Sequence, residues 1–138
     1  MKGELQKVVV VEGTEYTIQR FKGEQAFAIK YELGKVIVPF IKELQEAQNA
    51  PEEERAAKIL GAVEHIFAHT DYQTALRLLK TLVSQVYDSS GRLVVPNDEF
   101  AQNTVAWYLL AWEVILFNYA DVFSKLGFST SLENLNRA

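Results

Sequence analysis

Residues 105–123 read VAWYLLAWEVILFNYADVF, and this stretch decides the fold of the chain. It contains both tryptophans and is too apolar for a helix that turns one face to water. Glu113 in its middle, and Asn118 and Asp121 near its end, interrupt the roughly 20 consecutive apolar residues that a membrane span requires. The stretch therefore predicts a helix that is covered on more than one side, by its own domain or by a partner, and it predicts no membrane span.

The apolar residues of this stretch fall into two series at helical spacing. The first seam consists of Val105, Leu109, Trp112, Leu116, Tyr119, Phe123 and Leu126. The second seam consists of Trp107, Leu110, Val114 and Phe117. Because tryptophan and tyrosine are enriched at binding hot spots, we predict that the second seam binds a partner. The alternative is that it packs against the hairpin and the apolar stripe from Ile29 to Leu44.

Glu113 lies between the two seams. An unpaired carboxylate in the interior is costly and would have a raised pKa. We therefore expect Glu113 to reach solvent through a gap, or to meet a lysine from an earlier helix.

Two segments near the N-terminus predict a β-hairpin. Residues 5–11 and 14–21 are rich in β-branched and aromatic residues, and Glu12-Gly13 between them supplies a turn. Because two strands alone are marginally stable in water, we expect a third strand, for which residues 92–95 are the candidate.

The rest of the chain has helical periodicity. Pro39 interrupts an apolar stripe that runs from Ile29 to Leu44, which predicts two short helices in place of one. A helix from Glu52 to about His69, and another capped by Thr70 or Asp71, should follow. After a restart at Pro96-Asn97-Asp98, a last helix of some 27 residues is expected to carry the double seam to about Leu126. At ~1.5 Å per residue it would be about 40 Å long, so part of it should project beyond the core.

These elements predict a mainly α protein with a small N-terminal β-hairpin. We expect one compact domain of about five helices, with one long C-terminal helix, over residues 1–138. Residues 1–22 would form the hairpin, 23–127 the helical body and 128–138 a loose C-terminal tail.

The composition argues against several kinds of chemistry. The net charge is −4, and no lysine or arginine lies between Leu93 and Ser124, so we expect no nucleic-acid partner. The chain has no cysteine, no phosphate-binding glycine pattern and no nucleophile motif, so we predict no catalytic residue, no cofactor and no enzyme. His65 and His69 are spaced to share a metal ion, with Asp71 nearby, but two histidines on a helix surface is the simpler interpretation, and we predict no metal.

The order of the elements resembles that of the tail assembly chaperones of long-tailed bacteriophages. The likeness lies in the short hairpin, in a broken helix that carries Phe27, Leu33, Val36 and Pro39, and in an acidic-aromatic closing segment. The most similar motifs are Asp98-Glu99-Phe100, Trp112-Glu113-Val114 and Asn118-Tyr119-Ala120-Asp121-Val122-Phe123.

This resemblance implies a protein of phage or prophage origin that acts in the cytoplasm of a bacterial host and catalyses no reaction. Its partner would be the helical tape measure protein, bound through an apolar helix face before the tail tube polymerises, and the second seam is the candidate face. We also expect a homo-oligomer. One alternative is a structural virion component, such as a tail completion or connector protein. The other is a small metal-binding protein or enzyme that uses His65, His69 and Asp71.

Overall fold

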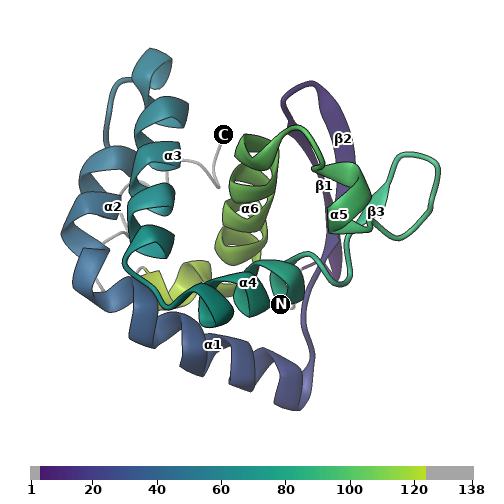
Figure 1. Ribbon diagram of the computed structural model, residues 1–138, viewed down its shortest axis with the longest axis horizontal. Coiled ribbons are helices and arrows are strands. Elements are labelled where there is room, and N and C mark those ends of the chain that lie inside the picture. The colour runs from purple at the N-terminus through teal and green to yellow at the C-terminus, as the bar shows by residue number, and fades with distance from the viewer. Residues whose placement is uncertain (1–3, 124–138) are drawn as a thin grey trace.

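The computed structural model describes the backbone of residues 4–123 and the side chains of residues 4–120. It is mainly helical, with a small antiparallel sheet, as the sequence predicts (Figure 1). In chain order the elements are β1 (Gln6–Val11), β2 (Thr14–Gln19), α1 (Gly23–Ile37), the 3-10 helix η1 (Val38–Phe40), α2 (Ile41–Gln48), α3 (Glu52–Ala68), α4 (Tyr72–Leu82), β3 (Tyr87–Asp88), α5 (Pro96–Glu99) and α6 (Thr104–Phe123).

The predicted hairpin is confirmed. β1 and β2 pair in antiparallel register, with Val9 opposite Tyr16. Glu12 and Gly13 form the turn with φ of 52° and 83°. Positive φ at both turn residues is the geometry whose twist matches that of the two strands. The turn therefore fixes the register locally.

The prediction that residues 92–95 form the third strand is wrong. The third strand is β3, in which Tyr87 pairs with Thr17 of β2, whereas Leu93 forms only an isolated bridge to Tyr87. The side chain of Asp88 accepts hydrogen bonds from the backbone N–H groups of Ser90 and Arg92, at 2.9 and 3.0 Å. This tight loop folds the predicted segment back on the outside of β3, away from β2.

The helix break at Pro39 is also confirmed. α1 ends at Ile37, η1 carries the proline in its first turn, and α2 starts at Ile41. α3 begins after Pro51 with three acidic residues in its first turn. α4 begins after Asp71, whose carboxylate accepts a hydrogen bond from Thr74 N–H at 3.0 Å. These helix starts follow the local signals in the sequence.

The last helix differs from its prediction, because it is interrupted twice. α5 ends at Glu99, and Asn103 caps a new start by accepting a hydrogen bond from Ala106 N–H at 3.1 Å. α6 then kinks at Tyr119, where φ is −131° and ψ is 23°. The 20 residues of α6 correspond to about 30 Å, the width of a small domain, so the described part does not extend beyond the core. Residues 124–126 of the predicted helix, and the predicted tail at 128–138, lie outside the described residues.

α6 is the centre of the fold. Figure 1 shows it between α3 on one side and the hairpin on the other, and it also packs against α4. The buried face of the sheet covers it with Val9, Val11, Tyr16 and Ile18. Asn118 joins α6 to the end of β2, since its Oδ1 accepts from Phe21 N–H at 2.8 Å and its Nδ2 donates to Gln19 O at 3.1 Å.

Candidate functional site

The second seam lies largely inside the protein. Leu110 and Val114 are 0% and 1% exposed, and Trp107 and Phe117 are half-buried. Trp107 Nε1 donates a hydrogen bond to the carbonyl of Leu79 at 3.1 Å. The prediction that the second seam binds a partner stays a prediction. Its four residues are Trp107, Leu110, Val114 and Phe117, and their burial limits what a partner can contact. In this conformation Leu110 and Val114 are out of a partner's reach, and Trp107 and Phe117 are only partly accessible.

Among the described residues, the most exposed aromatic side chains are those of Phe27 and Tyr31 on α1 and that of Tyr72, which is 75% exposed at the start of α4. Phe27 and Tyr31 are 70% and 60% exposed, with ring centroids 6.4 Å apart. We expected the surplus apolar surface on the last helix, whereas these exposed rings lie on α1 and α4. The expected homo-oligomer stays a prediction.

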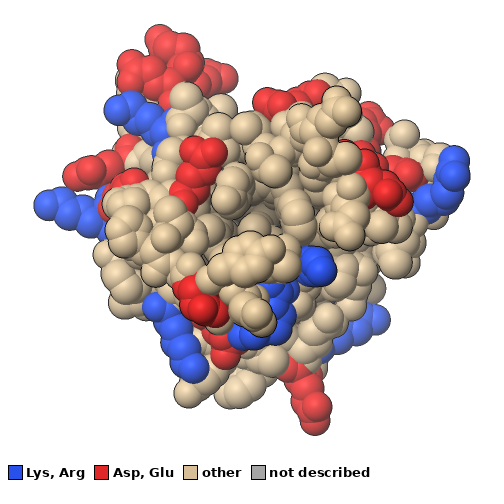
Figure 2. All heavy atoms as spheres, viewed as in Figure 1, with Lys and Arg blue, Asp and Glu red and all other residues tan. Residues whose placement is uncertain are grey.

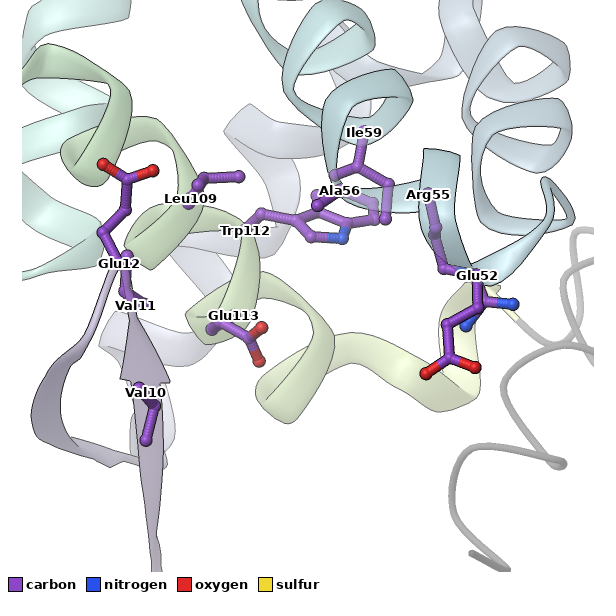
Figure 3. A pocket seen from close by; sticks show the side chains of 10 residues that line it. All are labelled: Val10, Val11, Glu12, Glu52, Arg55, Ala56, Ile59, Leu109, Trp112 and Glu113. Carbon is purple, nitrogen blue, oxygen red and sulfur yellow. The ribbon is translucent and has the colours of Figure 1, made fainter.

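Residues of α6 on its other side form the bottom of a surface groove with a cavity of about 400 Å³. Figure 3 shows α6 at the bottom, β1 and its turn along one side and α3 along the other. The residues that line this groove are Val10, Val11, Glu12, Glu52, Arg55, Ala56, Ile59, Leu109, Trp112 and Glu113. In the space-filling view of Figure 2, the surface between α3 and the hairpin is hollowed, and most atoms in the hollow belong to uncharged residues.

The charged residues of the groove are unbalanced. The described residues contribute three carboxylates to it, those of Glu12, Glu52 and Glu113, and one guanidinium, that of Arg55. Arg55 Nη2 donates to Ala50 O at 3.3 Å, and its Nε has no hydrogen-bond partner among the described residues. The carboxylates therefore outnumber the cations, which favours a ligand with positive charge.

Glu113 is the most unusual of these groups. Burial raises the pKa of its carboxyl group, and the positive charge of Lys7 partly opposes this shift. Lys7 lies on β1, so the expected lysine comes from the hairpin and not from an earlier helix. In Figure 3 the carboxylate projects from α6 into the space between β1 and α3. An ionised carboxylate in a partly apolar site is stabilised by any cation that enters the site.

The candidate metal ligands have other contacts. His65 Nδ1 lies 2.7 Å from Glu43 Oε1, and His69 Nδ1 lies 3.0 Å from the carbonyl of His65. Asp71 caps α4. Within residues 4–120, no three histidine, aspartate or glutamate side chains gather closely enough to hold a metal ion. Of the helices that the structure describes, none combines the length and apolar character needed to cross a membrane.

Sequence reasoning identified only part of the groove. The carboxylate of Glu113 within an apolar run was the one visible signal, and it does lie at the groove. No sequence pattern marked the groove residues of the hairpin and of α3, such as Val10 and Ala56, as part of a binding site. They are far apart in the sequence. They line the same groove because α6 lies between the hairpin and α3.

Comparison with known proteins gives one match. A family model described as "Phage tail assembly chaperone protein, TAC" matches residues 12–130, which is most of the chain. No curated protein and no solved structure matches the chain.

Proposed function

From the premise that the chain belongs to the phage tail assembly chaperone family, we propose that it binds an apolar segment of the tape measure protein in the groove between β1, α3 and α6. It would do so in the cytoplasm of the bacterial host, before the tail tube polymerises, and without catalysing a reaction. The tape measure protein is the partner that the resemblance implied.

The observation that carries this proposal is the groove itself. It is concave and open to the surface, and Leu109 and Trp112 provide an apolar bottom with a few charged groups around it. A mainly apolar site with few polar groups is typical of binding sites, in which burial supplies affinity and the polar groups supply specificity. Our proposal still uses an apolar face of the last helix, as the sequence predicted. The face is now the first seam, to which Leu109 and Trp112 belong, and not the second.

The groove can be blocked without disturbing the core. Ala56 is an exposed residue of α3 that lines the groove, and the exposed Ala57 beside it does not. In Ala56→Arg a long side chain would fill the groove, whereas in Ala57→Arg the same side chain lies outside it. Both replacements keep a good helix former, so the stability of the two variants should be similar.

The test has two parts. Each variant is co-expressed with the tape measure protein from the same genome and captured on a tag. Assembled tails are then counted when each variant replaces the wild type in the presence of all the tail genes. We expect wild type and Ala57→Arg to retain the tape measure protein and to support tails, and Ala56→Arg to do neither. If the wild-type protein captures no tape measure protein, the proposal is wrong.

Two other outcomes would favour the alternatives. Capture that survives Ala56→Arg but is lost in a folded Phe117→Asp variant would place the contact on the second seam. Recovery of the protein from purified virions would favour a structural component of the particle.

A further inference from the structure

β1 is an edge strand of the sheet, and in the part of the chain that the structure describes no strand pairs with its outer edge. Residues of an antiparallel pair alternate between those that bond to the partner strand and those that do not. Arg20 N–H donates to Leu5 O at 3.0 Å, so in the observed register the odd-numbered residues bond toward β2. Val8 and Val10 therefore turn their backbone N–H and C=O groups to the open edge.

This open edge borders the groove. Val10 is 62% exposed, yet it lines the groove together with Val11 and the turn. Figure 1 shows the sheet with β1 on the side that faces α3 and β3 on the far side, and Figure 3 shows β1 across the groove from α3. Val10, whose backbone donor and acceptor have no strand partner in the described part of the chain, thus lies beside an apolar surface, and Val8 continues the same edge.

The conformation of a ligand follows from this arrangement. A helix satisfies its own backbone groups, so it could fill the groove but would leave the edge of β1 unused. An extended segment can pair with Val8 and Val10, as peptides do when they add a strand to a sheet edge. Its side chains would alternate, so that every second one points the same way as Val9 and Val11, toward α6.

The charges of the groove restrict the ligand further. Glu113 lies between the apolar bottom and β1, and Glu12 and Glu52 lie at its sides. Among the described residues, Arg55 is the only cation that lines the groove, and its Nη2 already donates to Ala50 O. A lysine or arginine among the inward side chains of an extended segment would be attracted to Glu113.

We propose that the segment of the client binds in extended form, as a fourth strand on the edge of β1. Its inward apolar side chains would lie on Leu109 and Trp112, and one lysine or arginine would approach Glu113. This inference rests on the proposed function and specifies how the segment is held.

Amide hydrogen exchange of the full-length protein tests the pairing. The probes are overlapping synthetic peptides that cover the tape measure protein of the same genome. In the free protein we expect the Val8 and Val10 amides to exchange rapidly and the Val9 amide slowly. With a bound peptide, exchange at Val8 and Val10 should slow by tenfold or more.

A proline variant tests the same contact by affinity. In Val10→Pro the outward N–H is lost while pairing with β2 is kept, because proline is tolerated where the missing N–H faces away from the sheet. Peptide binding should weaken by about tenfold or more, the loss expected from one hydrogen bond and the added ring. The matched control is Leu93→Pro, outside β3 at the opposite side of the sheet, which should bind as wild type does.

The two proposals fail in different ways. If peptides bind but the Val8 and Val10 amides remain rapid in exchange, or Val10→Pro binds normally, the strand pairing is wrong and the proposed function stands. If neither the peptides nor the whole tape measure protein binds, both proposals fall. Slow exchange of these amides in the free protein would overturn the pairing as well, since a second copy or residues 124–138 would then already cover the edge.

Discussion

Replacing Glu113 by glutamine should raise the stability of the protein and weaken its binding of a client. Glutamine has nearly the same shape as glutamate and lacks its charge. In the folded protein the carboxylate is partly buried between α6 and the hairpin, and Lys7 is the positive charge that acts on it. An ionised group in such a place destabilises the folded state relative to the unfolded chain, in which water surrounds it.

The size of the effect follows from this environment. Mutational data give about 1–3 kcal/mol for a polar group that is buried without full compensation. Glu113 is only partly buried, and Lys7 offsets part of the cost of burying its charge. We therefore expect the lower end of this range, so that Glu113→Gln raises the free energy of unfolding by about 1 kcal/mol. For a chain of this length that gain raises the Tm by about 4 °C.

The dependence on pH has a definite sign. Because folding raises the pKa of Glu113 above its ordinary value of 4.5, the folded state holds this proton more tightly than the unfolded chain. The contribution of the group to stability is therefore fully present below the ordinary pKa and is lost as the pH rises through the raised pKa. The advantage of Glu113→Gln should disappear below about pH 4 and be complete at neutral pH.

Thermal unfolding followed by circular dichroism at several pH values measures this difference. The matched control is Glu52→Gln, the same replacement at another groove residue. Glu52 lies in the first turn of α3, where a negative charge is favourable, so its loss should lower stability by a few tenths of a kcal/mol, roughly. If Glu113→Gln is less stable than wild type at neutral pH, the carboxylate has a stabilising partner and our account of the groove is wrong.

Two further predictions concern the interior. Leu110→Ala should destabilise the protein by about 2–5 kcal/mol in urea unfolding, because Leu110 is 0% exposed, and a loss under 1 kcal/mol would show that the second seam is not core. Asn118→Ala should cost about 2–3 kcal/mol, since it removes the hydrogen bonds to Phe21 N–H and Gln19 O and leaves both groups partly buried. Unchanged amide exchange at Phe21 in that variant would contradict this role.

Local signals in the sequence were sufficient for much of the fold. The hairpin was predicted because Glu12-Gly13 separates two β-rich segments, and the break at Pro39 because proline cannot continue a helix. The acidic residues of the first turn of α3 and the capping residue Asp71 of α4 likewise marked where these two helices begin. Each of these features depends on residues within a few positions of one another.

The errors arose where a local pattern had more than one outcome. The apolar run allowed a continuous helix to residue 126, but the caps and hydrogen bonds around Asn103 and the kink at Tyr119 divide it. Residues 92–95 have strand character, but Asp88 closes a loop that leaves β3 next to β2. The sequence pattern alone does not weigh such side-chain hydrogen bonds against helix or strand propensity.

The sequence by itself determined that the chain is mainly helical, begins with a hairpin and buries a tryptophan-rich helix, because periodicity, turns and caps act over short distances. Only the tertiary structure decided which residues of that helix lie wholly in the core and which border a groove. It buries Leu110 and Val114, and it places Leu109, Trp112 and Glu113 in a groove between α3 and the free edge of β1. Both faces are apolar, so the choice depended on how elements distant in the sequence pack around α6.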